Sequence, residues 1–284
     1  MSMNIPYKFT EPPKSTVIIE IATSDGGSAV GSLVTVKNQS GNEYQKKASG
    51  PTVIFFDVPY GSFTVLISHE DYKPCVYNNL NVKASTVTQA ISLQSNKIHI
   101  GDLVSFGAFN WRVLDIVDNS ALLICDTIVE CKQYHISFKD IKWTHCWLRI
   151  YLNETFYNSD YFSESDRLLI KHVTNENCDN DWYGTNGGPN TLDKIFLLGI
   201  DELVKYYGDS GELKNRPKGA TWINDQFNAK RVASFNGSPS WWWIRLPGIG
   251  NSFAAFVSSS GGICKYGAGV DSGGGIRPAL WIEI

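Results

Sequence analysis

The sequence predicts an α+β protein of two domains, because strand patterns and helical patterns occupy different parts of its 284 residues. Residues 15–95 consist of short β-branched runs that turn residues interrupt at intervals of about 8–12 residues, which is typical of a β-sandwich. Residues 98–284 combine strand runs with stretches of helical spacing, and they end in strands that return the chain to a core. We therefore expect an N-terminal arm over residues 1–14, a β-sandwich over residues 15–95 and a larger α+β domain over residues 98–284.

Composition and charge exclude several classes of partner. The chain carries 25 Lys and Arg residues against 28 Asp and Glu residues, a net charge of −3, and its longest basic block is Lys46-Lys47. We therefore expect no binding to nucleic acid and no attraction to an anionic membrane. No apolar run approaches the roughly 20 residues that span a bilayer, and the first residues lack the regions of a signal peptide. The expected protein is soluble, and it reaches any extracellular location without a cleaved signal.

The first domain contains a more specific pattern. Val58-Pro59-Tyr60-Gly61 turns tightly between two strand runs, and Tyr72 follows the second run. This stretch resembles the carboxypeptidase-regulatory-like and transthyretin-like β-sandwich family, with Phe63 in place of the usual Tyr and Asp71 in place of the usual Gly. The resemblance implies an Ig-like or prealbumin-like sandwich that serves as a spacer or a binding module. Its strands are expected at residues 15–22, 32–38, 52–58, 62–69, 79–84 and 85–93.

The second domain begins with strands and then changes period. Two strands are expected over residues 104–126, around a turn at Asp118-Asn119. Residues 142–162 place a mostly apolar stripe at helical spacing, and Thr144 can serve as an N-cap, so we expect a helix there.

A second short helix is expected after Ser163. Residues 175–191 are loop by composition, and residues 193–199 are expected to form a buried strand. A third helix over residues 200–208 should end at Gly208, a favoured C-cap residue. The inward-facing residues of the second helix are expected to be Leu168, Leu169 and Val173.

Catalytic and metal-binding motifs are not apparent in the sequence. The five histidines form no HxH or HExxH pair, and the six cysteines show no CxxC spacing, so we expect no metal, no cofactor and no disulfide framework. His145 and Cys146 are adjacent, but neighbours on a helix point about 100° apart and cannot easily share a proton. Residues 188–190 and 222–225 suggest a calcium-dependent lectin, yet the first fragment lacks the acidic residue that such lectins place before Pro-Asn. Calcium needs several converging oxygen ligands, so we expect Asp225 to be a turn or cap residue.

Residues 241–284 form the most distinctive segment of the chain. A Gly- and Ser-rich stretch lies there between the triple tryptophan Trp241–Trp243 and a hydrophobic end. So polar a stretch would normally be disordered, but the apolar residues at both of its ends should anchor it. In a strand, alternation sends Trp241 and Trp243 to one face and Trp242 to the other. We interpret the segment as an ordered scaffold that displays small and polar side chains.

The same segment resembles a known family. The strings WWIRLPG, AAFVSSSGGI, GAGV and GIRPALWIEI, with WRVLDIVDNSALLI, WLRIYLNETF and DKIFLLG before them, are similar to the C-type-lectin-fold variable proteins of diversity-generating retroelements in gut bacteria and their phages. The resemblance covers about residues 98–284 and implies a C-type lectin fold with a variable region over about residues 241–284. It implies ligand recognition without catalysis: a phage tail-tip receptor binder or an adhesin, at a virion surface or another extracellular surface. The implied partner is a protein or glycan receptor on a target cell, and a homo-oligomer would increase avidity.

The resemblance also assigns roles to positions of this sequence. Aromatic anchors at Phe253, Phe256 and Tyr266 would supply most of the affinity, while polar and charged residues tune specificity. The variable set is Ile249, Gly250, Asn251, Ser252, Phe253, Phe256, Ser258, Ser260, Cys264, Lys265, Tyr266, Asp271, Ser272 and Gly273. The fixed framework is Trp242, Trp243, Arg245, Pro247, Gly248, Gly275, Arg277 and Pro278, with Ala254, Ala255, Val257, Gly261, Ile263, Gly267 and Val270 between them.

Three positions of the last segment carry specific expectations. Arg277 should anchor the chain end by bonding backbone carbonyls or a carboxylate. Cys264 should be an exposed thiol with no chemical purpose. Leu246 departs from the family pattern, which has Ser there, so we expect this position to vary too.

Two alternatives to a diversified binding protein stay open. The segment can be a Gly-rich terminus of a lectin-fold adhesin with no diversification. Alternatively, the chain can be a lectin-fold enzyme of the formylglycine-generating type, which uses a closely spaced pair of reactive cysteines. That enzyme would place a metal or a reactive cysteine in a cleft, so a second thiol beside Cys264 or a metal near His145 would favour it.

Overall fold

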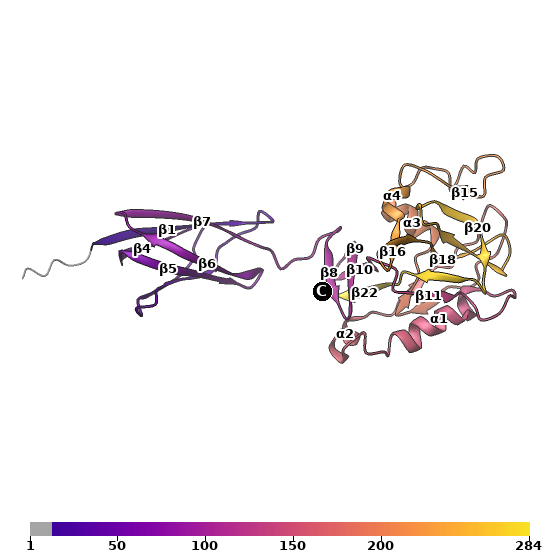
Figure 1. Ribbon diagram of the computed structural model, residues 1–284, viewed down its shortest axis with the longest axis horizontal. Helices are drawn as coiled ribbons and strands as arrows, with labels where there is room; N and C mark the ends of the chain where they lie inside the picture. The colour runs from indigo at the N-terminus through magenta and orange to yellow at the C-terminus, as the bar shows by residue number, and fades with distance from the viewer. Residues whose placement is uncertain (1–12) are drawn as a thin grey trace, which may run out of the picture. The chain divides into compact units, whose positions relative to one another are not determined.

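The computed structural model describes residues 13–284, which divide into two compact units between Ile98 and His99 (Figure 1). Most of the arm expected over residues 1–14 therefore lies outside the described residues. The structure is 46% strand and 11% helix. We expected an α+β protein with an Ig-like sandwich followed by a C-type lectin fold. The α+β class is wrong, because the helices of residues 13–284 are all short and the protein is mostly β.

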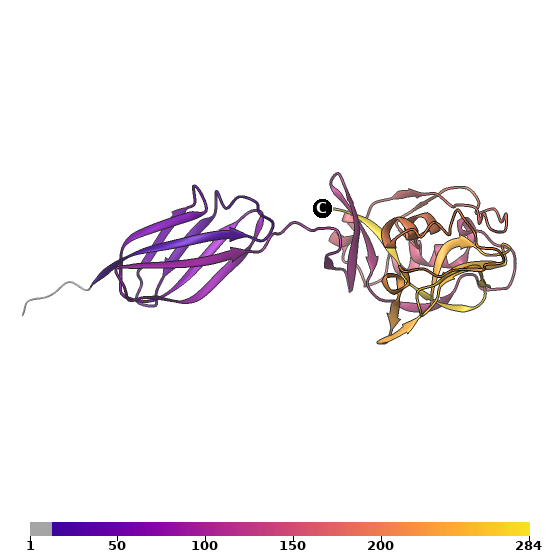
Figure 2. The same cartoon turned by 90° about the horizontal axis from the view of Figure 1, so that it is seen from above.

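The first unit is a sandwich of two β-sheets (Figure 2). Its core alternates along the strands, as Val17, Ile19 and Ile21 of β1 show, each buried between more exposed neighbours. The two sheets have the orders β4-β1-β7 and β3-β2-β5-β6, and β1 pairs with β7 in parallel. The strands are β1 (Lys14–Thr23), β2 (Leu33–Lys37), β3 (Glu43–Lys47), β4 (Thr52–Pro59), β5 (Gly61–His69), β6 (Tyr72–Val82) and β7 (Thr86–Leu93).

The second unit contains a five-stranded sheet of order β14-β22-β10-β9-β8. All six residues of its central strand β10 are buried, which fits a strand covered on both faces. The last strand, β22, pairs with β10 on one side and with β14 on the other, so the expected return of the chain to the core is confirmed. The strands are β8 (Leu103–Phe106), β9 (Phe109–Val117), β10 (Ser120–Cys125), β14 (Ile195–Phe196) and β22 (Ala279–Glu283).

A six-stranded sheet of order β11-β21-β18-β19-β20-β15 carries most of residues 241–284. Its strands are antiparallel except where β18 pairs with β21. They are β11 (Glu130–Gln133), β15 (Trp222–Ile223), β18 (Trp242–Pro247), β19 (Phe253–Val257), β20 (Ile263–Gly269) and β21 (Gly273–Ile276). Two antiparallel two-stranded sheets are also present: β12 (Val173–Asn175) with β13 (Thr191–Asp193), and β16 (Ala233–Phe235) with β17 (Ser238–Ser240).

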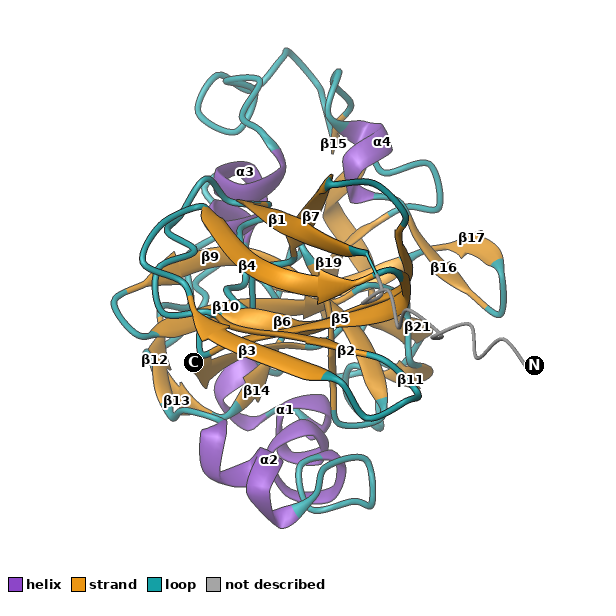
Figure 3. Ribbon diagram, turned by 90° about the vertical axis from the view of Figure 1, so that its left-hand side faces the viewer, coloured by secondary structure: helices purple, strands orange, loops and turns teal. Residues whose placement is uncertain are grey.

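Short helices lie at the margins of these sheets, α1 and α2 at one side and α3 and α4 at the other (Figures 1 and 3). The helix expected over residues 142–162 is interrupted: a 3₁₀ turn precedes α1, and a π-helical turn follows it. The Sγ of Cys146, and not Thr144, caps α1 by accepting from the backbone N–H of Arg149. The elements are η1 (Trp143–His145), α1 (Trp147–Tyr151), η2 (Leu152–Phe156), α2 (Glu164–Leu169), α3 (Ile200–Tyr207) and α4 (Asn228–Arg231).

Two further helix predictions have opposite outcomes. The helix expected after Ser163 is confirmed as α2, and Ser163 caps it through a reciprocal bond with Asp166. Leu168 is 85% exposed, so the predicted inward face of this helix is wrong. Helix α3 ends at Gly208, whose φ of 124° only glycine adopts easily, so its predicted end is confirmed.

Candidate ligand-binding surface

The side chain of Phe256, on β19, lies at the centre of one aromatic group. Its ring is 5.6 Å from that of Trp222 and 5.0 Å from that of Trp241, in edge-on contacts. The pairing of the strands explains this, because Trp222 pairs with Cys264 and Cys264 pairs with Phe256. Residues directly opposite one another in neighbouring strands point to the same face. All three rings are partly exposed.

The side chain of Tyr266, on β20, belongs to a second aromatic group. Its ring is 5.7 Å from that of Phe253 and 6.2 Å from that of Tyr183, and Phe138 lies 5.6 Å from Phe253. Tyr266 is 40% exposed and Phe138 is 56% exposed. Strand β19 contributes Phe253 to this group and Phe256 to the other, and its register with β20 shifts between Ala254 and Phe256. We call the two groups together the aromatic surface: Phe138, Tyr183, Trp222, Trp241, Phe253, Phe256 and Tyr266.

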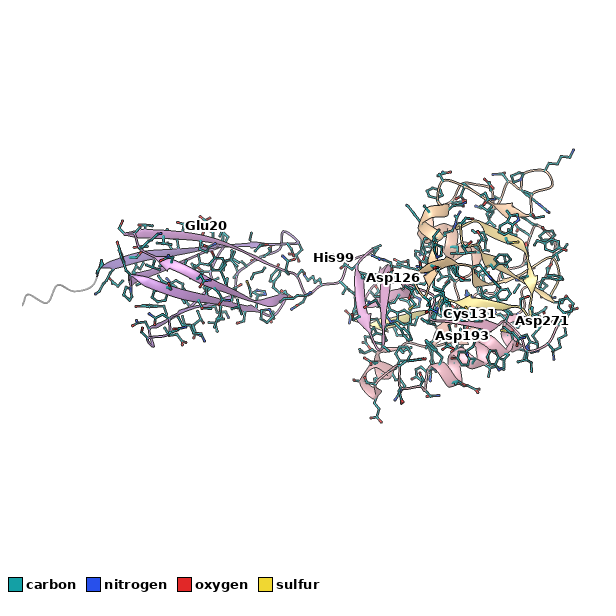
Figure 4. All side chains as sticks on the ribbon, viewed as in Figure 1. Glu20, His99, Asp126, Cys131, Asp193 and Asp271 are labelled. Carbon is teal, nitrogen blue, oxygen red and sulfur yellow. The ribbon has the colours of Figure 1, made fainter. Side chains whose placement is uncertain are left out.

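Polar residues lie at both ends of β19. Ser258 and Ser260 follow the strand, and their hydroxyl oxygens are 3.0 Å apart. Ser252 precedes the strand and accepts a backbone bond of 3.0 Å from Val270, which brings the turn before β21 to the same end. Asp271 lies exposed in that turn, at the edge of the second unit (Figure 4). The aromatic surface therefore has polar side chains at its rim.

Twelve of the fourteen predicted variable residues are at least partly exposed. The two exceptions are Cys264, which is 5% exposed, and Lys265, which is fully buried. The prediction of an exposed thiol is therefore wrong, and burial raises the pKa of Cys264. The exposed twelve are Ile249, Gly250, Asn251, Ser252, Phe253, Phe256, Ser258, Ser260, Tyr266, Asp271, Ser272 and Gly273.

The side chain of Lys265 lies in the core and is not displayed at the surface. Its Nζ pairs with Oδ1 of Asp181 and lies 4.7 Å from the centre of the Trp182 ring. It occupies the inner side of β20 together with Ile263, which is also fully buried. Burial lowers the pKa of Lys265, and the Asp181 carboxylate opposes that shift. The expected role of Lys265 in tuning specificity is therefore wrong in this structure.

Buried polar bonds hold the predicted framework. Arg277 donates from Nε to the carbonyl of Cys125 at 2.8 Å, which confirms its expected bonding to backbone carbonyls. Arg245 donates to the carbonyl of Leu197 at 3.0 Å and to the carboxylate of Glu202 at 3.3 Å. Two framework residues, Pro247 and Gly267, are partly exposed. Leu246 is fully buried, so its side chain is not displayed at the surface. The buried framework residues are Trp242, Trp243, Arg245, Gly248, Gly275, Arg277 and Pro278, with Ala254, Ala255, Val257, Gly261, Ile263 and Val270.

Residues outside the last segment also position the surface, and sequence analysis missed them. The amide Nδ2 of Asn180 donates to the carbonyls of Pro247 and Lys265, both at 2.8 Å. The hydroxyl of Thr185 donates to the carbonyl of Ile249 at 3.0 Å. These residues lie in the stretch interpreted as loop by composition, where no periodic pattern could mark a buried amide.

A buried ion pair supports the turn after β19. Arg231 is fully buried, and its Nη2 lies 2.6 Å from Oδ1 of Asp225. Its Nε donates to the carbonyl of Gly261 at 2.8 Å. Asp225 also accepts from the backbone N–H of Phe227, which agrees with the turn role expected for it. The buried guanidinium of Arg231 was not anticipated, because one of its partners, Gly261, lies 30 residues further along the chain.

The candidate chemical groups have other roles in the structure. Among residues 13–284, no three His, Cys, Asp or Glu side chains gather as a metal ion would need. Cys146 is buried and caps α1, and burial raises its pKa to about 12, so its thiol stays protonated at neutral pH. All six cysteines are free, and Cys264 lies between the cross-strand residues Trp222 and Phe256. No helix in the described part of the chain is long and apolar enough to cross a bilayer.

Comparison with known protein families finds one match, which covers more than half of the chain. The model of a family described as "Domain of unknown function (DUF6273)" matches residues 118–284. No curated protein matches the chain.

Two solved structures share local similarity with it. A DUF4876 family protein from Bacteroides thetaiotaomicron VPI-5482 has 12% identity and a TM-score of 0.26, over 43% of this chain and 34% of that chain. A protein described as a "putative carbohydrate binding protein" from Bacteroides uniformis ATCC 8492 has 13% identity and a TM-score of 0.25, over 43% of this chain and 58% of that chain. The chain thus covers less than two thirds of either protein, and such low TM-scores support no statement about fold or ligand.

Proposed function

The chain belongs to the DUF6273 family, and we propose that it is a ligand-binding protein whose aromatic surface contacts a receptor on a target cell. The observation that carries the proposal is the packing of partly exposed rings on β15, β19 and β20 and on the segments beside them. Phe256 contacts Trp222 and Trp241, while Tyr266 contacts Phe253 and Tyr183.

The physical properties of these rings suit a binding surface. Aromatic side chains supply a large contact area and have few rotatable bonds, so little conformational entropy is lost when they bind. The rings of the aromatic surface already hold one another in edge-on contacts, which fixes their orientation further. The polar side chains at the rim can exchange their bonds to water for bonds to a ligand. The expected mechanism is complementarity on a rigid scaffold.

We also propose that the exposed positions of residues 249–273 vary between copies of the gene. The resemblance to retroelement-diversified proteins supports this, and so does the burial of the framework residues beside exposed positions. Substitution at an exposed position away from special backbone geometry usually changes stability by less than about 0.5 kcal/mol. A changing surface would therefore leave the fold intact. Cys264 and Lys265 are outside this proposal because their side chains are buried.

The test of ligand binding uses the full chain, labelled with a fluorophore, on a panel of gut-bacterial strains. We expect saturable binding to particular strains, and we expect Phe253→Ser and Tyr266→Ser to weaken it about tenfold or more, as truncation of an aromatic anchor does. Phe56→Ser is the matched control, since Phe56 is an exposed phenylalanine in the first unit. Equal binding by all three variants and the unchanged chain would contradict the proposal.

A further inference from the structure

A hollow of about 510 Å³ lies in the second unit and shares no lining residue with the aromatic surface. We propose that this hollow binds a small molecule that carries a carboxylate. Residues from β9, from the segment after β10, from α3 and from the end of the chain line it. The residues that carry the argument are Arg112, Asp126, Tyr207, Lys230 and Arg277.

The lining carries more positive than negative charge. Arg112, Lys230 and Arg277 face the hollow together with a single carboxylate, that of Asp126. Asp126 is already engaged, because its Oδ1 lies 2.9 Å from Nη2 of Arg112. Among the ion pairs of residues 13–284, none includes Lys230 or Arg277. Two cations at the hollow therefore lack a counter-charge.

Arg277 makes the stronger case, because it is only 4% exposed. Its guanidinium donates to the neutral carbonyl of Cys125 at 2.8 Å and lies 5.1 Å from the centre of the Trp242 ring. Its Nη1 has no hydrogen-bond partner of good geometry in the described structure. The hydroxyl of Tyr207 lies close enough to this guanidinium for Arg277 to oppose the rise in the pKa of Tyr207 that burial causes. A buried cation bonded only to neutral groups is unfavourable unless an anion compensates it. A buried guanidinium that has no anion beside it and lines a hollow can bind both oxygens of a carboxylate, because its donors are arranged as a fork.

The rest of the lining indicates what carries the carboxylate. Aliphatic residues and Tyr206 are among the lining residues, and the volume falls within the range of about 300–1,000 Å³ typical of small-molecule sites. A charged group attached to an apolar ring or a short aliphatic chain would place its charge at Arg277 and its carbon atoms against the wall. The aliphatic lining residues are Ile100, Val113, Leu114, Val232 and Ala233.

The test compares an acid with its neutral counterpart, using the full chain. Phenylacetate and phenylacetamide have nearly the same shape, and glucuronate tests whether a sugar can carry the acid. Isothermal titration calorimetry should show saturable binding of at least one acid and binding of phenylacetamide that is about tenfold weaker than that of phenylacetate. Equal affinity for the acid and the amide, or no binding of either acid at 20-fold excess, would overturn the proposal.

Variants locate the binding. We expect Lys230→Ala to weaken acid binding about threefold or more, while Lys218→Ala, at an exposed lysine outside the hollow, leaves it unchanged. Arg277→Lys should weaken it further, because a point charge replaces a fork of donors. If Arg277→Lys fails to fold, Lys230→Ala still decides the question, and no effect of Lys230→Ala would reject the site. Tyr266→Ser should leave acid binding unchanged, so this test succeeds or fails independently of the receptor-binding test.

Discussion

At the scale of single residues, the glycines of the last segment are of two kinds. Gly261 has a φ of 85°, and a Cβ placed on it would lie 1.9 Å from the carbonyl oxygen of Asn228. Gly273 has room around it, because no atom lies within 4 Å of such a Cβ. The first glycine was assigned to the framework and the second to the variable set, and the geometry gives a physical reason to treat them differently.

This contrast gives a stability prediction. Gly261→Ala should lower the free energy of unfolding by at least about 2 kcal/mol, because it combines a steric overlap with an unfavourable φ. Gly273→Ala, the matched control, should change it by less than about 0.5 kcal/mol. Urea unfolding of both variants would measure the difference, and similar losses for the two would contradict the distinction.

Lys265 shows where interpretation of single positions fails. The first three residues of β20 are all buried, so exposure does not alternate along this strand. A lysine is so rarely buried that composition suggests an exposed side chain. Only the position of Asp181, 84 residues earlier in the chain, shows that a buried ammonium group can be paired there. No pattern within the last segment contains that information.

The Lys265–Asp181 pair predicts an asymmetry between two variants. Lys265→Met should change stability by less than about 1 kcal/mol, because an apolar side chain of similar length fits a buried site. Asp181→Ala should cost about 1–2 kcal/mol, since it leaves the buried ammonium group unpaired, although the 58% exposure of Asp181 limits the loss. Chemical denaturation measures both values, and a larger loss for Lys265→Met would contradict this view of the pair.

The same lysine predicts a dependence on pH. Because burial lowers the pKa of Lys265, the unfolded chain binds more protons than the folded chain between the folded pKa and the ordinary lysine value. The contribution of this group to the free energy of unfolding therefore rises as the pH increases through that window. Lys265→Met should remove this rise, which urea unfolding at successive pH values would detect. An unchanged pH dependence would show that other groups cause it.

At the scale of elements, strands were easier to predict than helices. The runs at residues 52–58 and 62–69 became β4 and β5, because alternation of buried and exposed side chains follows directly from a pleated strand. The run at residues 142–162 has helical spacing, but α1 contains five residues before the chain changes to a π-helical turn. Aromatic packing explains part of this, since Phe156 stacks on Phe109, which lies on β9. Such tertiary contacts override local spacing, and the sequence does not reveal them.

The loop over residues 175–191 predicts an element-scale effect. Asn180→Ala should lower the free energy of unfolding by about 2–4 kcal/mol, because the carbonyls of Pro247 and Lys265 would lose a buried donor. Hydrogen exchange should become faster at residues 247–250 in this variant. Asn190→Ala, at an exposed asparagine of the same loop, serves as the control. Unchanged exchange at residues 247–250 would show that Asn180 does not hold this turn.

At the scale of the whole molecule, the two compact units suggest separable folding. Each has its own core, and the aromatic surface belongs wholly to the second unit. A fragment of residues 99–284 should therefore fold alone and bind the same bacterial strains as the full chain. Calorimetry and the cell-binding assay would test this, and a fragment that unfolds or loses binding would reject it.

The diversification proposal is tested in the genome. A reverse transcriptase gene beside a near-identical downstream copy of the last coding segment, differing only at adenines, is the expected arrangement. Variation found at codons 249–273 but not at codons for buried framework residues would support the proposal further. If related strains show no variation at codons 249–273, an adhesin with one fixed surface is favoured.

Strand β22 follows every proposed variable position and supplies the neighbour on one side of the buried strand β10. A gene copy in which mutagenesis creates a stop codon within codons 249–273 would encode a chain without β22. Such a product would expose an apolar edge of β10 and become a substrate for proteases. Because β22 comes after every proposed variable position, cellular proteases would remove such truncated chains. Only gene copies with an intact reading frame would then yield a folded protein that carries the aromatic surface.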